Sequence, residues 1–133
     1  MEKINSQKLK IELTGEMIGG YQKFIIKGKL IYTTIQWAKQ QVDELIRKED
    51  GYIVDLHNIT QIDSTGFGFL INLGKKLMKN DENMVILVKD KMIRELFGIS
   101  KLDQVFCVVE TLEDGINILN KKNKQFAIKL EEY

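Results

Sequence analysis

One short segment of the sequence carries residues that can do chemistry, and it begins with Asp63, Ser64, Thr65 and Gly66. We expect this segment to start a helix with Ser64 as the N-cap, because a serine hydroxyl accepts a hydrogen bond from a free amide of the first turn. Asp63 then lies beside the positive end of the helix dipole, which favours a negative charge. Gly66 and Gly68 remove side chains from the first turn, so a partner's backbone or a phosphate can approach closely. The segment therefore predicts either an ordinary helix cap or a site for an anion.

The elements around this segment alternate between strands and helices. Apolar runs at residues 9–13 and 24–26 predict two strands, and Gly15 and the Gly19-Gly20 pair supply turns between them, so we expect a β-hairpin. The remaining expected elements are helices over residues 33–48, 65–80, 91–97 and 112–121, strands over residues 52–56, 84–88 and 105–109, and a polar loop between residue 56 and the Asp63 segment. Alternating strands and helices require a mostly parallel sheet with helices packed on it. The sequence predicts an α/β fold: a mixed, mostly parallel β-sheet begun by a β-hairpin, with about four helices packed on it.

The length of the chain bounds its domain organisation. A chain of 133 residues fits one domain and is too short for two. We expect residues 1–133 to form that domain, with a core over about residues 9–121 and a C-terminal tail over residues 122–133. The alternating apolar residues of the tail fit an edge strand or a helical extension.

Charge and composition exclude several classes of function. The formal net charge is +1, so the chain has no basic field to attract nucleic acid or an anionic membrane. Its apolar stretches are shorter than a membrane span, and no apolar run follows the early lysine as it does in a signal peptide. We therefore expect a cytoplasmic protein without direct nucleic-acid or membrane partners.

The sequence offers no catalytic or metal-binding constellation. It holds one histidine, His57, and one cysteine, Cys107, which are too few for a metal site. A P-loop, a G-x-S-x-G motif and a dinucleotide motif are all missing from the sequence. The carboxylates near Ser64 lack the second acid or the nucleophile–base pair that hydrolysis requires. We therefore expect no enzyme activity, no cofactor and no metal.

Three segments together resemble the STAS domain family, in particular its stand-alone bacterial anti-sigma-factor antagonists. Residues 62–70 (IDSTGFGFL) resemble the family's (M/I)-D-S-(S/T)-G-L-G-x-L motif. Residues 53–56 and 59–62 resemble its strand and loop pattern, and residues 94–102 (RELFGISKL) resemble its R-L-F-x-x-(S/T)-G-L helix end. The resemblance covers roughly residues 9–121 and implies a STAS-like fold.

The resemblance also implies a mechanism. In that family the serine directly after the aspartate is phosphorylated, and this serine corresponds to Ser64. The unmodified domain binds an anti-sigma factor, which is also a serine kinase, and so frees a sigma factor for transcription. The kinase phosphorylates the serine with ATP, the complex dissociates, and a PP2C-type phosphatase restores the active form. We expect Asp63, Thr65, Gly66 and Phe69 on the partner surface, although Phe69 also fits packing on a neighbouring helix.

The sequence departs from the family after the second predicted strand. The family often has Gly-Glu-Leu-Asp there, whereas residues 28–31 of this chain are GKLI. Lys29 and Ile31 replace two acids that help with partner contacts, and we expect both at the partner surface for a different partner. The departure leaves an alternative open: a non-phosphorylated STAS scaffold or sensor module in a stress-signalling assembly.

Overall fold

The computed structural model describes residues 10–78 and 83–131, with side chains up to residue 123. Its five-stranded sheet has the order β1-β2-β3-β4-β5, with an antiparallel β1–β2 pair followed by parallel neighbours. The strands are β1 (Ile11–Ile18), β2 (Tyr21–Leu30), β3 (Gly51–Ile62), β4 (Met84–Leu87) and β5 (Cys107–Val109). The predicted α/β fold, with a mostly parallel sheet begun by a hairpin, is confirmed.

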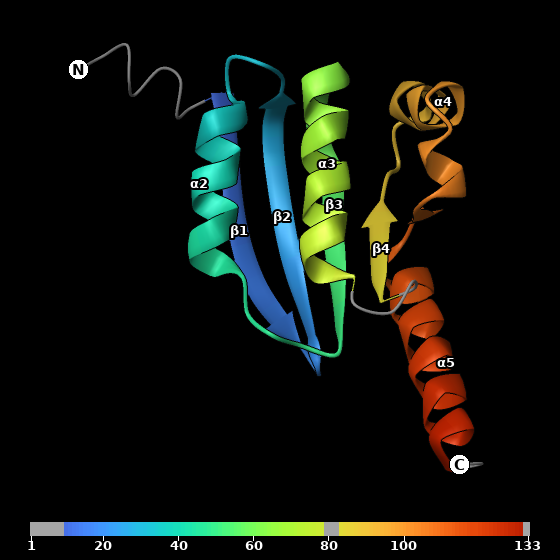
Figure 1. The fold of residues 1–133 in the computed structure, drawn as a ribbon. Coiled ribbons are helices and arrows are strands. Elements are labelled where there is room, and N and C mark those ends of the chain that lie inside the picture. The colour runs from blue at the N-terminus through green and yellow to red at the C-terminus, as the bar shows by residue number, and fades with distance from the viewer. Residues whose placement is uncertain (1–9, 79–82, 132–133) are drawn as a thin grey trace.

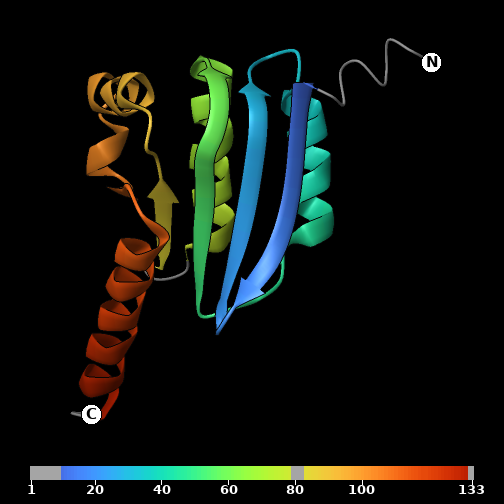
Figure 2. The same ribbon diagram turned by 180° about the vertical axis from the view of Figure 1, so that it is seen from behind.

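In the described residues, four α-helices and one short 3-10 helix pack around this sheet. They are α2 (Ile35–Leu45), α3 (Ser64–Leu77), α4 (Lys91–Ile99), the 3-10 helix η1 (Leu102–Gln104) and α5 (Leu112–Glu131). Helices α2 and α3 lie side by side on one face of the sheet (Figure 1). Seen from behind, the strands lie in front of that pair (Figure 2), and α5 packs on the face of the sheet opposite to it. Of the two options for the tail, the helical extension is observed up to Glu131.

The β1–β2 hairpin turns at Gly19 and Gly20. Ile18 pairs with Tyr21, so the turn has two residues, and Gly19 has φ 59°. A positive φ at this position is typical of the turns that match the twist of a hairpin, and glycine adopts it without strain. The expected turn at Gly15 is wrong, because Gly15 lies within β1 opposite Phe24.

Strand β3 is longer than the sequence predicts. The expected polar loop after residue 56 is wrong, because β3 continues to Ile62 and pairs there with the end of β2. Two register shifts occur in this pairing, and Leu56, Ile59 and Ile62 are buried in the core although Asn58, Thr60 and Gln61 between them are exposed. As a result, only Asp63 separates the strand from helix α3. Leu9 and residues 79–80, where we expected element ends, lie outside the described residues.

The apolar core has two parts, one on each face of the sheet. Successive residues of a strand point to opposite faces, so Val54 contributes to the core under α2 and α3 while Ile53 contributes to the core under α5. The α5 part contains Tyr21, Ile53, Val85, Leu87 and Leu119. Interior strands covered on both faces are typical of parallel sheets. Helix α3 is thereby fixed firmly along its length, and only its first turn reaches the edge of the sheet.

Candidate functional site

Asp63, and not Ser64, is the N-cap of helix α3. Its Oδ1 accepts a hydrogen bond from the Gly66 N–H at 2.9 Å, and its Oδ2 accepts one from the Tyr32 N–H at 3.0 Å. The expected cap at Ser64 is therefore wrong by one residue. Both residue types are good caps, and the extension of β3 to Ile62 moves the helix start so that Asp63 takes the role. The same carboxylate joins the start of α3 to the loop after β2.

Ser64 is consequently the first residue of the helix, and its hydroxyl is not used for capping. The residue is exposed, and its hydroxyl makes no hydrogen bond to the described part of the chain. Thr65 beside it is half-buried. A serine at the first helical position lies at the positive end of the helix dipole, where added negative charge is stabilised. The arrangement presents one unengaged hydroxyl to solvent at an electropositive point.

Gly66 faces inward and has a packing role. A Cβ on Gly66 would lie 2.2 Å from the Leu30 carbonyl oxygen and 2.8 Å from Ile62 Cγ1. The expectation that Gly66 lies on the partner surface is wrong, because this residue is buried where α3 meets the end of β2. A Cβ on Gly68 would meet no heavy atom within 4 Å. Gly68 is therefore the glycine that keeps the outer side of the first turns open.

Lys29 and Ile31 lie at the same edge of the sheet as Ser64. Leu30 between them pairs with Ile62, and its carbonyl accepts a hydrogen bond from the Asp63 N–H at 3.3 Å. Lys29 is exposed, whereas Ile31 is half-buried. The end of β2 and the start of α3 thus form one continuous surface that carries a positive charge at Lys29.

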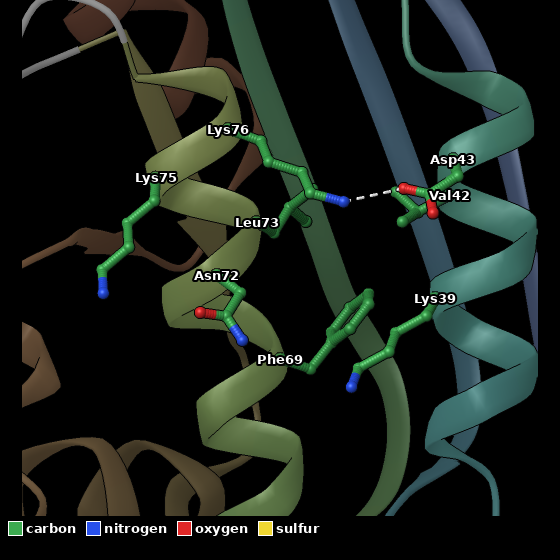
Figure 3. Close-up of a pocket in the computed structure, with 8 residues that line it drawn as sticks. All are labelled: Lys39, Val42, Asp43, Phe69, Asn72, Leu73, Lys75 and Lys76. Carbon is green, nitrogen blue, oxygen red and sulfur yellow. Dashed lines mark hydrogen bonds and ion pairs between the residues drawn. The ribbon is translucent and has the colours of Figure 1, made fainter.

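Phe69 is buried, with 4% of its surface exposed, and it packs between α3 and α2. The expectation that Phe69 contacts a partner is wrong, because the neighbouring helix α2 covers its ring. Its edge lines a cleft of about 410 Å³ between the two helices, together with Lys39, Val42 and Asp43 from α2 (Figure 3). An ion pair of 2.9 Å between Lys76 and Asp43 bridges this cleft. Ser64 is not among the residues that line this cleft.

Two groups of exposed apolar residues near Ser64 were missed by the sequence reasoning. Tyr32 has 72% of its surface exposed, and it follows β2 directly in the loop that Asp63 holds. Met92 and Ile99 of α4 are 74% and 78% exposed. Met92 belongs to the apolar pattern of the helix expected over residues 91–97, which predicts burial, and Ile99 lies beyond the end of that expected helix.

Within the described residues, there is no group of three or more His, Cys, Asp or Glu side chains that could hold a metal ion. His57 is half-buried in β3 rather than in a loop, and its Nε2 lies 2.8 Å from the Glu110 carbonyl oxygen. None of the helices in the described ranges is long and apolar enough to cross a membrane.

Comparison with known proteins places this site in a family. Residues 16–115 match the STAS domain. Over 60 residues the chain is 38% identical to the anti-sigma-B factor antagonist of Staphylococcus epidermidis, a stretch that covers 45% of this chain and 56% of that protein. The chain thus spans little more than half the length of this curated relative.

Solved structures show the same fold. An anti-sigma factor antagonist from Mycobacterium paratuberculosis superimposes with a TM-score of 0.76 at 19% identity, covering 83% of this chain and 94% of the other. SpoIIAA, an anti-sigma factor antagonist in its unphosphorylated form, gives a TM-score of 0.65 at 17% identity, covering 83% and 97%. This Bacillus protein has also been solved in its phosphorylated form. The family match extends over more than half of the sequence, and the chain therefore belongs to the STAS domain family.

Proposed function

We propose that this chain is an anti-sigma-factor antagonist whose binding is switched off by phosphorylation of Ser64. The observation that carries the proposal is the exposed Ser64 hydroxyl at the first position of α3, left unengaged because Asp63 caps the helix. A kinase must reach such an oxygen, and a docking partner must be able to cover it. Both requirements are met at this edge of the sheet.

Phosphorylation at Ser64 is compatible with the fold. A phosphate adds a charge of about −1.5 to −2, and the positive end of the α3 dipole stabilises negative charge in the first turn. The Asp63 cap already bonds the Gly66 and Tyr32 amides, so the modification displaces no existing hydrogen bond of the serine. The interface is what changes, because a docked partner would have to desolvate a dianion where a neutral hydroxyl had been.

The relatives support the identity of the partner. A protein with 38% identity over 60 residues is an anti-sigma-B factor antagonist, and SpoIIAA is known in both phosphorylated and unphosphorylated forms. By analogy, the partner of this chain is an anti-sigma factor that is also a serine kinase, and binding releases a sigma factor in the cytoplasm. A PP2C-type phosphatase returns the chain to its active form. The chain itself acts by binding and performs no catalysis.

Phosphate transfer tests the proposal directly. Each anti-sigma factor encoded in the same genome is incubated with the protein and ATP, and the phosphorylated residue is located by mass spectrometry. We expect transfer to the wild type and to the matched control Thr65→Ala, and none to Ser64→Ala. Ser64→Asp should keep its fold yet bind the same anti-sigma factor at least about tenfold more weakly.

Lys29 supports one alternative, the non-phosphorylated scaffold or sensor module. Its exposed ammonium lies at the same edge as Ser64, where the family often has an acid. If no anti-sigma factor of the genome transfers phosphate to Ser64, the switch proposal is wrong and this alternative replaces it.

A further inference from the structure

Helix α4 carries apolar residues on two sides, and only one of them is buried. Ile93 and Phe97 face the core, with 6% and 1% of their surfaces exposed. Met92, Leu96 and Ile99, which we call the α4 stripe, are 74%, 38% and 78% exposed. Their spacing of four and three residues places them along one side of the helix. Single exposed apolar residues are ordinary, whereas a contiguous stripe of them marks an interaction surface.

The exposed apolar residues of this protein are unevenly distributed. Six large ones are exposed in the described ranges: Met17, Tyr32, Met92, Leu96, Ile99 and Val105. Met92, Leu96 and Ile99 lie on α4, and Val105 directly follows η1. Tyr32 lies in the loop bonded to Asp63. Met17 lies at the opposite end of the sheet, next to the hairpin turn. Five of these six residues thus lie in the loop bonded to Asp63, on α4 or just after η1.

The α4 stripe is structurally connected to the start of α3. The Phe97 ring packs edge-to-face on the ring of Phe67, with the ring centres 5.2 Å apart. Phe67 lies one helical turn after Ser64, and its backbone N–H is bonded to the Asp63 carbonyl. Asp90 caps α4 through a 3.0 Å bond from the Ile93 N–H. In Figure 1 the start of α3 lies between the loop after β2 and helix α4. The position of the stripe relative to Ser64 is therefore fixed.

We propose that the α4 stripe is a second contact surface for the same anti-sigma factor that docks at Ser64, an inference that rests on the proposed function. A stable protein interface covers about 800 Å² on each partner, far more than one serine and its neighbours supply. Such an interface combines an apolar core with a polar rim. Tyr32 lies in the loop that Asp63 holds, and the stripe lies on the helix whose Phe97 packs on Phe67 of α3, so a partner that covers Ser64 is also placed to cover them. The partner needs an apolar patch of its own beside the part that contacts Ser64.

The two contact surfaces respond differently to phosphorylation. A phosphate on Ser64 changes the charge at the start of α3 but leaves the side chains of the stripe unaltered. Substitutions at well-separated positions that contact no common residue usually combine additively. The stripe therefore contributes the same factor to affinity in the unmodified and the phosphorylated protein. As a result, the kinase keeps a residual affinity for the phosphorylated chain.

The test compares two methionines that differ in position. Met92→Glu changes the stripe, and Met17→Glu makes the same change at an exposed methionine at the far end of the sheet. Affinity is measured by calorimetry for the anti-sigma factor that phosphorylates Ser64. We expect Met92→Glu and Ile99→Glu each to weaken binding by about tenfold or more, and Met17→Glu to change it by less than twofold. The fold losses caused by Met92→Glu in the wild type and in Ser64→Asp should agree. Urea denaturation checks that each variant remains folded.

Each other outcome overturns a specific claim. If Ser64→Asp weakens binding but both stripe variants bind like the wild type, the stripe inference is wrong and the proposed function stands. If neither change weakens binding, or no anti-sigma factor binds, both are wrong. If sedimentation shows a dimer of the free protein that Ile99→Glu converts to a monomer, the stripe is a self-association surface, and this inference is wrong.

Discussion

Gly66 lets the first turn of α3 lie against the end of β2, and its replacement by alanine tests that contact. The added Cβ would lie 2.2 Å from the Leu30 carbonyl oxygen and 2.8 Å from Ile62 Cγ1. Non-bonded heavy atoms settle at about 3.5 Å or more, so the helix start must move outward by roughly 1 Å. The movement also lengthens the hydrogen bond from the Asp63 N–H to the Leu30 carbonyl, which is 3.3 Å in the native protein.

Two opposing contributions set the magnitude of the change in the free energy of unfolding. Overpacking costs about 1–3 kcal/mol, and we expect the upper end because the obstructing atom belongs to the backbone and cannot rotate away. Alanine recovers up to about 1 kcal/mol over glycine inside a helix. Gly66→Ala should therefore lower the free energy of unfolding by about 2 kcal/mol. Gly68→Ala meets no atom within 4 Å, so only the helix contribution remains and stability should rise by about 0.5–1 kcal/mol.

Urea denaturation of the wild type and the two variants measures these effects. For a slope of about 2 kcal/mol per molar urea, Gly66→Ala shifts the midpoint down by about 1 M. The two variants make the same chemical change two positions apart in one helix, so effects on the unfolded chain largely cancel between them. A Gly66→Ala midpoint equal to or above that of Gly68→Ala would refute the packing argument.

Substitutions at three further positions test the assignments around the site by the same measurement. Phe69→Ala should cost about 3–5 kcal/mol because the ring is buried; a change below about 1 kcal/mol, as expected of a surface residue, would contradict its packing role. Asp63→Ala removes the acceptor of two backbone amides and should cost about 1–2 kcal/mol, with a smaller loss for Asp63→Asn. Lys76→Met removes an ion pair whose side chains are 54% and 57% exposed, so a change beyond about 0.5 kcal/mol would be inconsistent with a solvent-screened pair.

The order of the elements could be predicted because it depends on local pattern. Gly19 and Gly20 mark the hairpin, and apolar runs such as that of β4 mark interior strands. The length of β3 could not be predicted, because its polar residues after Leu56 are typical of a loop. Its pairing with the end of β2 overrides that composition. The same extension decides whether Asp63 or Ser64 caps α3, a choice that residue preference leaves open.

The location of the site was predictable, but the direction of its side chains was not. The motif identified the start of α3, where the structure exposes Ser64. Whether Gly66 and Phe69 face outward depends on neighbours distant in sequence, namely the Leu30 carbonyl and helix α2. The exposure of Met92 and Ile99 has the same origin, because α4 has only one packed side. Tertiary contacts, and not local pattern, sort the residues of this site into core and surface.

The far part of β3 determines which strands set the orientation of Ser64. From Leu56 to Ile62, roughly 20 Å at about 3.3 Å per residue, the strand pairs with β2 alone, because the β4 pairing ends at Asp55. This part of the sheet, made by β1, β2 and β3, extends past the ends of β4 and β5. The orientation of the hydroxyl is therefore inherited from the twist of β1, β2 and β3. Sequence changes in α5, which packs on the opposite face of the sheet, can adjust overall stability and still leave the orientation of Ser64 unchanged.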